Sequence, residues 1–164
     1  MSYNTGIRNL RDGSLSIKDN ATHTCTVVCD EGDLNWREQQ EVKVQKCRGA
    51  LTSARTGDAI PLELNCTFKW ANLIQHTLLS SDPIVPYELI NNVGSEYTSW
   101  DTGYFCLKWE FSVASPDGVS TKGEKITFSK VWKTSLDCRE GDEANTVAFS
   151  GMSLAALPTI ARLS

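Results

Sequence analysis

The sequence predicts a mainly β protein: a β-barrel or sandwich of two packed antiparallel sheets, with one short flanking helix and a long loop. Two segments carry this prediction, because apolar and polar residues alternate along residues 61–70 and 105–113. A period of two places apolar side chains on one face of a strand and polar side chains on the other. The 164 residues are expected to form a single domain, since this length can bury a sizeable core.

The first third of the chain is expected to contain three strands. Residues 15–17 alternate after the turn at residues 12–13, and residues 24–29 form a second short strand-like run. The third run covers residues 36–46. The Glu-Gly-Asp turn at residues 31–33 is expected to join the second and third runs as a hairpin, because Gly allows the positive φ of tight turns.

Residues 47–60 are predicted to form a long loop. They contain two glycines and two arginines and show no sustained periodicity. A loop of this length inside a compact domain is often functional. Small residues mixed with Arg and Asp favour a contact role for this loop, and the alternative is a mobile excursion without a partner.

The rest of the chain alternates strands with one helix. Strands are predicted at residues 61–70, 105–113, 126–132 and 146–150, and a second Glu-Gly-Asp turn at residues 140–142 joins the last two. A helix is predicted from about residue 84 to residue 91, with Asp82 as its N-cap and Pro83 at its first position. The C-terminal tail, residues 152–164, begins with a small, apolar run and is expected to dock on the domain or on a neighbouring subunit.

Charge and hydropathy argue against several classes of protein. The formal net charge of −4 argues against sequence-independent binding to DNA. No apolar run approaches the ~20 residues of a membrane-spanning helix, so no membrane anchor is expected. Residues 1–6 contain no apolar segment, which predicts that a secretory signal is absent.

The chemistry of a catalytic or metal site is also not expected. The chain has two histidines, and the set His23, Cys25 and Cys29 is spread along a predicted strand, so it cannot surround a zinc ion without a bend and a fourth ligand. The carboxylates of the two Glu-Gly-Asp turns could act in glycoside cleavage, but solvated hairpin tips are the favoured interpretation. No cofactor motif is present, so the sequence predicts a protein that is not an enzyme and binds no cofactor.

The six cysteines have different expected environments. Cys25 and Cys29 are four residues apart in a predicted strand and so lie about 13 Å apart, too far for a disulfide between them. Cys66 alternates with apolar residues and is expected in the core. Cys47 and Cys138 adjoin turns and are expected to be accessible.

Several short motifs occur in an order that matches a known family. They are Arg48-Gly49, Ala54 to Asp58, Phe68 to Trp70, Pro86 to Ile90, Phe128 to Trp132, Glu140 to Thr146 and Phe149 to Gly151. In this order and spacing, from roughly residue 13 to residue 159, the chain resembles the tail tube proteins (major tail proteins) of tailed bacteriophages. That family is related in fold to the tube proteins of type VI secretion and contractile injection systems.

The resemblance implies a structural virion protein that assembles into hexameric rings, which stack into the hollow tail tube through which DNA reaches the host. Implied partners are other copies of the chain, a tape-measure protein and DNA in the lumen, baseplate and tail-terminator proteins at the ends, and a sheath in contractile tails. The protein would be part of the virion tail and would be made in the cytoplasm of a host bacterium.

The resemblance also suggests roles for individual residues. Ring-to-ring contacts are expected at Arg48, Arg55 and Asp58. Candidates for the wall of the lumen are the polar-face residues Glu63, Asn65, Lys108 and Glu110. Candidates for disulfides between subunits, formed after release from a reducing cytoplasm, are Cys25, Cys29, Cys47 and Cys138; the alternative is that all six thiols are inert.

The sequence is also consistent with two alternatives to a phage tail tube. The first is a tube protein of a non-phage contractile injection or secretion system, which would share the fold. The second is a monomeric β-sandwich that binds glycans or proteins. Rings or tubes in electron micrographs would favour a tube protein, and a dispersed monomer at high concentration would favour the binding module.

Overall fold

The computed structural model describes residues 13–27, 34–74, 84–94, 97–113, 123–141 and 145–162. The described residues form ten strands and two short helices. In chain order they are β1 (Gly13–Lys18), β2 (Thr24–Val27), β3 (Asn35–Arg37), β4 (Gln40–Cys47), β5 (Ala50–Ala59), β6 (Leu62–Lys69), α1 (Trp70–Ile74), α2 (Pro86–Asn91), β7 (Leu107–Val113), β8 (Glu124–Arg139), β9 (Thr146–Ser153) and β10 (Thr159–Arg162). The predicted mainly β fold is confirmed.

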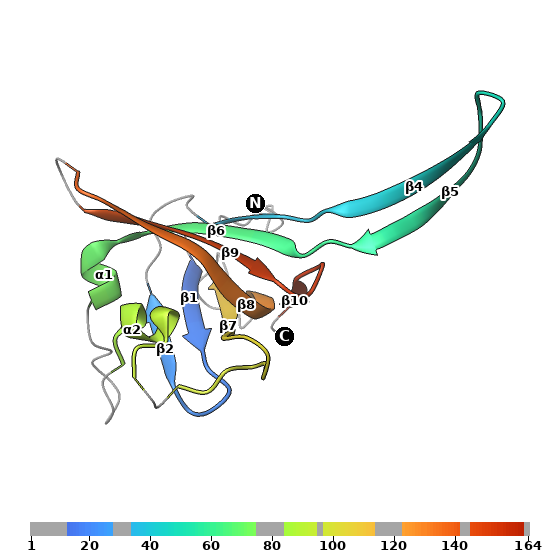
Figure 1. The fold of residues 1–164 in the computed structure, drawn as a ribbon. Coiled ribbons are helices and arrows are strands. Elements are labelled where there is room, and N and C mark those ends of the chain that lie inside the picture. The colour runs from blue at the N-terminus through green and yellow to red at the C-terminus, as the bar shows by residue number, and fades with distance from the viewer. Residues whose placement is uncertain are drawn as a thin grey trace, which may run out of the picture.

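Eight strands form one antiparallel sheet that folds over on itself into two layers (Figure 1). The strand order is β2-β1-β7-β8-β9-β6-β3, and β10 pairs with β8 outside this path. The 16-residue strand β8 belongs to both layers: residues 124–128 pair with β7, residues 132–139 pair with β9, and Val131 pairs with both. Between these two parts Lys130 has a φ of 51°, so the backbone changes direction there. The result is sandwich-like packing, with β1, β2 and β7 in one layer and β6, β9 and β3 in the other.

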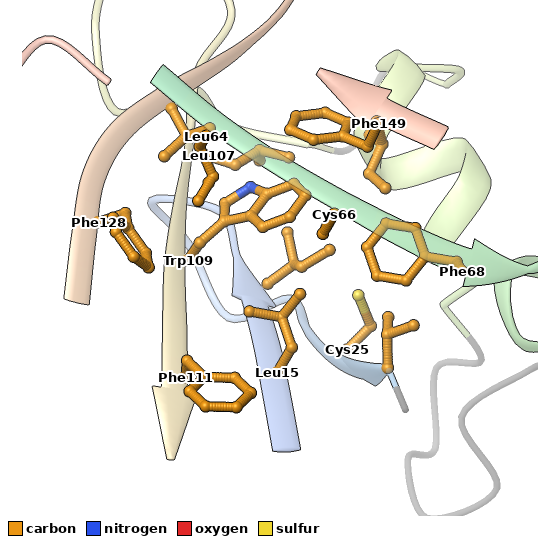
Figure 2. Packing of buried hydrophobic residues seen from close by; sticks show 14 of the residues in the cluster. Leu15, Cys25, Leu64, Cys66, Phe68, Leu107, Trp109, Phe111, Phe128 and Phe149 are labelled. Atoms are coloured by element: carbon orange, nitrogen blue, oxygen red, sulfur yellow. The ribbon is translucent and has the colours of Figure 1, made fainter. Parts of the chain in front are cut away.

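The core lies between the two layers, as Figure 2 shows. Trp109 of β7 is 1% exposed and packs across the gap on Phe149 of β9 and Phe68 of β6, with ring centroids 4.4 and 6.3 Å away. Trp36 of β3 packs edge-on against Phe128 of β8 at 5.6 Å. Aromatic rings from both layers therefore interlock, and the alternating residues that predicted the long strands supply them.

The remaining two strands, β4 and β5, form a two-stranded arm that projects from the sandwich (Figure 1). The prediction of a long loop at residues 47–60 is therefore wrong, because β5 occupies most of this segment and pairs with β4. The turn consists of Arg48 and Gly49, whose φ angles of 48° and 83° are both positive, as a type I′ turn requires. All residues from 42 to 56 are exposed, so neither face of the hairpin has to be apolar. The sequence therefore lacks the period of two that identifies a half-buried strand.

The first Glu-Gly-Asp turn does not close a hairpin. β2 pairs with β1, and β3 pairs with β6, at the two opposite ends of the sheet order. Residues 28–33 lie outside the described part of the chain, but the strands on either side of them belong to different layers. The second turn does join paired strands, since β8 and β9 are antiparallel neighbours with Arg139 opposite Thr146.

Both helices differ in detail from the prediction. α2 begins at Pro86, with the extended residue Val85 as its N-cap, and ends at Asn91, where Asn92 follows as a C-cap in the left-handed conformation. The predicted N-cap Asp82 and first helical residue Pro83 lie outside the described residues. The helix starts at Pro86, which is equally suited to a first helical position. α1 was not predicted, since its first residue, Trp70, continues the alternation of β6. Neither helix is long and apolar enough to cross a membrane, a finding that covers the described residues only.

A buried carboxylate fastens the turn after β1 to the segment that leads into β7. Asp19 is 2% exposed, and its carboxylate accepts hydrogen bonds from the backbone N–H groups of Ala21, His23 and Thr98, each at 3.0 Å, and from Nδ1 of His23 at 2.8 Å. Burial alone would raise the pKa of Asp19, but the hydrogen bonds from Thr98, His23 and Ala21 outweigh it and leave the pKa below its ordinary value.

Replacing this carboxylate should destabilise the fold. Asp19→Ala leaves three backbone N–H groups without their acceptor, so the free energy of unfolding should fall by roughly 3 kcal/mol in urea titrations at pH 7. Because the folded pKa is lowered, the carboxylate stabilises above its unfolded pKa and this contribution fades as the pH falls below about 4. The exposed Asp137→Ala is the matched control, and equal losses for both variants would contradict the prediction.

Candidate assembly surfaces

The arm carries the three residues predicted to make ring-to-ring contacts. Arg48 is in the turn at its tip, and Arg55 lies on β5 opposite Lys43. Asp58 is at the base of the arm, where its carboxylate is 3.4 Å from Nζ of Lys43 and its N–H donates to the Glu41 carboxylate at 2.6 Å. Within the described residues no ion pair engages Arg48 or Arg55, so both guanidinium groups are available to a partner.

The arm has two different faces. The register places Val42, Val44 and Leu51 on one face, and their side chains are 54%, 50% and 71% exposed. Lys43 and Arg55 lie on the other face. A two-stranded hairpin by itself is marginally stable in water. Three large apolar side chains exposed on one face of such a hairpin are typical of a surface that contacts a partner.

The first pair of lumen candidates lies on the outer face of the layer that contains β6. Glu63 and Asn65 alternate with buried apolar residues of β6 and point away from the core. Asn65 is opposite Asn35 of β3, with Nδ2 of Asn65 3.4 Å from Oδ1 of Asn35. Glu63 is opposite Arg37 of the same strand. This face is thus polar with charges of both signs.

The second pair lies on the outer face of the other layer. Lys108 and Glu110 alternate with the buried residues Leu107, Trp109 and Phe111 of β7. Since the inner faces of β6 and β7 pack on one another, their outer faces point in opposite directions. The structure therefore does not bring the four lumen candidates together, and one bore can be lined by only one of the two pairs.

Glu110 is the centre of a charge cluster. It is 5% exposed, and its carboxylate is 2.6 Å from Nζ of Lys18, 3.0 Å from Nζ of Lys125 and 3.1 Å from Nζ of Lys108. Burial on its own would raise the pKa of Glu110, but the hydrogen bonds from Lys18, Lys125 and Lys108 lower the pKa to about 2. Three ammonium groups around one carboxylate make this outer face locally cationic.

Removing this charge should cost stability. Glu110→Gln leaves three neighbouring lysines without their counter-charge, so the free energy of unfolding at pH 7 should fall by about 2 kcal/mol, after allowance for the partial exposure of the lysines. The depressed pKa means that the wild-type advantage is present above about pH 4.5 and is lost as the pH falls toward 2. Chemical denaturation across this range measures it. Glu88→Gln, on an exposed position of α2, is the control, and a pH-independent difference would contradict the prediction.

The cysteines fall into two groups. Cys66 is 1% exposed, as predicted for a core residue. Cys25 is completely buried, and burial raises the pKa of its thiol to about 12, so the structure removes it from the candidates for inter-subunit disulfides. Cys47 and Cys138 are exposed, at the tip of the arm and near the end of β8, at opposite ends of the molecule (Figure 1). Cys29 is outside the described residues.

A hollow of about 190 Å³ lies at the β8–β9 end, and no sequence pattern predicts it. Its lining residues are Trp70, Cys138, Arg139, Glu140, Asn145, Thr146 and Val147. Trp70 forms one wall, and its ring packs edge-on against Tyr87 of α2 with centroids 5.3 Å apart. Trp70 continues the apolar alternation of β6, but the chain turns into α1 at this residue and leaves it half-buried.

These features define the chain as a two-layer antiparallel β-sandwich with a short helical corner and a projecting hairpin. Neither a protein-family model nor a curated protein sequence matches it. Similar solved structures come from contractile injection systems. A chain of the PVC sheath–tube complex in its extended state matches with a TM-score of 0.52 and 8% identity, over 93% of this chain and 90% of that one.

Two further similar chains come from the anti-feeding prophage, AFP. One, from the 6-fold symmetrised baseplate, has a TM-score of 0.52 and 6% identity over 98% of this chain and 97% of its own. The other, from the tube-terminating cap, has a TM-score of 0.51 and 12% identity over 99% and 95% of the two chains. The likeness covers nearly the whole of each chain, and at these identities it shows a shared fold.

Proposed function

We propose that this protein is the building block of a hollow tube: copies close into hexameric rings, and the rings stack into the tube of a phage-tail-like assembly. The observation that carries the proposal is the exposed arm, a hairpin with three large apolar side chains in solvent and two unpaired arginines among the described residues. Such a surface is suited to contact with another copy. The role would be structural, without an enzymatic reaction.

The sequence motifs and the structural likeness support two settings for this tube. The motifs favour the tail tube of a bacteriophage, in which the bore guides DNA and a tape-measure protein, with baseplate and terminator proteins at the ends. The similar chains from the PVC and AFP assemblies favour a contractile injection system, in which a sheath surrounds the tube. Arg48, Arg55 and Asp58 would contribute to contacts between rings in either setting.

The two outer faces of the sandwich differ in their suitability for a bore that DNA must pass. The face with Lys18, Lys108 and Lys125 would hold phosphate groups, because clustered lysines bind nucleic acid in a sequence-independent way. The face with Glu63 and Asn65 carries charges of both signs and would be less adhesive. We therefore assign Glu63 and Asn65 to the lumen.

Negative-stain electron microscopy of the concentrated, purified protein tests this function. Rings with six-fold class averages, or tubes built from them, are the expected result. A dispersed monomer at the highest attainable concentration, both in micrographs and in sedimentation velocity, would overturn the proposal and would favour a monomeric binding module instead.

A further inference from the structure

We infer that the hollow at the β8–β9 end receives the tip of the arm of a second copy of this chain. The inference rests on the proposed function and names the partner of the arm within the assembly. It has three independent supports: the placement of the two surfaces, their charges and their shapes.

The two surfaces lie at opposite ends of one band of strands, in which the separate two-stranded arm runs on into the sandwich (Figure 1). β5 leads into β6 through two residues, Ile60 and Pro61, and β6 pairs with β9 over its whole length. β9 in turn pairs with β8, whose end forms the hollow. Copies that follow one another along this band bring the arm of one to the hollow of the next. Such a head-to-tail contact uses two different surfaces and can repeat without limit or close into a ring.

The charges of the two segments are complementary. Residues 42–57 of the arm contain four basic residues and no acidic residue. Residues 137–141, at the β8–β9 end, contain two acidic residues, Asp137 and Glu140, and one basic residue, Arg139. Opposite charges on two surfaces accelerate their encounter and select the correct orientation.

The shapes and polarities of the two surfaces also match. Leu51 is 71% exposed beside the turn of the arm, and the hollow offers Trp70 and Val147 as apolar walls. A volume of about 190 Å³ corresponds to roughly six water molecules, which is enough for an aliphatic side chain. Arg48, three residues before Leu51, would then pair with Glu140 at the rim. Trp and Arg are the residues that most often dominate binding energy in interfaces.

Thiol cross-linking tests the contact directly, because each surface carries one exposed cysteine. In the Cys29→Ser background, a bismaleimide with a flexible spacer should join Cys47 of one copy to Cys138 of the next and give a ladder of dimers, trimers and longer species. Cys47→Ser and Cys138→Ser should each abolish the ladder. If the Cys138→Ser variant still gives dimers but no longer species, the contact is arm to arm and the inference is overturned. The absence of any linked species in assembled protein would also overturn it.

A charge exchange supplies a second test that does not depend on cysteine. Arg48→Glu and Glu140→Arg should each raise the critical concentration for assembly about tenfold, and the double variant should recover most of this loss. Arg37→Glu and Glu88→Arg are matched controls, since both side chains are exposed elsewhere on the molecule. Additive losses in the double variant would overturn the pairing.

The two tests separate this inference from the proposed function. The protein could form rings or tubes in micrographs but give no Cys47–Cys138 link and no rescue in the double variant. That result would refute the arm-to-hollow contact and leave the tube function intact. A Cys47–Cys138 ladder from a protein that forms only irregular chains would support the contact and refute the closed rings.

Discussion

Shortening the arm should abolish tubes while leaving the sandwich folded. We consider a variant in which residues 42–57 are replaced by Asn-Gly, so that a type I′ turn joins Glu41 directly to Asp58. All residues from 42 to 56 are exposed, so the free energy of unfolding should change by less than about 0.5 kcal/mol. Loss of the apolar face and of Arg48 and Arg55 should remove the contacts between copies. Pelleting and negative-stain microscopy measure assembly, and urea titration measures the fold.

The matched control keeps the length of the arm and changes only a small polar side chain. Thr52→Ser is suitable, because the hydroxyl group that donates to the carbonyl oxygen of Gln45 is retained. This variant should assemble as the wild type does. Tubes of normal length from the shortened variant would show that the arm is dispensable and would remove the main support for its role.

Trp109→Ala should produce the largest loss of stability of any single substitution considered. The indole is 1% exposed and bridges the two layers through Phe68 and Phe149. Its removal should lower the free energy of unfolding by about 4 kcal/mol, because it combines lost apolar burial with a cavity that neighbouring strands cannot close. Chemical denaturation of the protein measures this directly, and Trp109→Phe should cost less.

The control for this prediction is Leu154→Ala, since Leu154 is 53% exposed after the end of β9. Its effect should stay within about 0.5 kcal/mol. A loss of less than about 1 kcal/mol for Trp109→Ala would mean that the two layers do not depend on this bridge.

The half-buried strands could be predicted from sequence because burial imposes a period of two. Leu62, Leu64 and Phe68 had to face the core together, and so did Trp109 and Phe111, which made β6 and β7 recognisable without a structure. The long β8 was recognised only in part, because its second half carries little buried apolar surface. A pattern therefore predicts a strand to the extent that one of its faces is excluded from water.

The arm could not be predicted for the same physical reason. Residues 50–56 are exposed on both faces, so no core within the subunit imposes a period of two on their sequence. The prediction of a hairpin at the first Glu-Gly-Asp turn was wrong for another reason. Local turn chemistry favours a hairpin there, but the order of strands depends on how the two layers close over Trp109. β2 and β3 consequently separate to the two ends of the sheet.

The family resemblance and the composition of residues 47–60 together made Arg48 and Arg55 candidate contact residues, whereas nothing in the sequence indicated the hollow. The hollow exists because the chain leaves the sheet at Trp70, beside the end of the β8–β9 hairpin, which lies some seventy residues later in the sequence. Cys138 was expected to be accessible because it adjoins a turn, and it is exposed, whereas only the structure shows that Cys25 is a core thiol. The spacing of residues in the sequence does not indicate which distant segments lie side by side in the fold.

The passage of β8 through both layers has a mechanical consequence. A pull applied to the end of β8 along the strand would place in shear the hydrogen-bond ladders that β8 forms with β7, β9 and β10. The two layers would thus resist tension as a unit, with no weak seam between them. A subunit joined to its neighbours at opposite ends of this band would transmit force along the assembly through its covalent backbone.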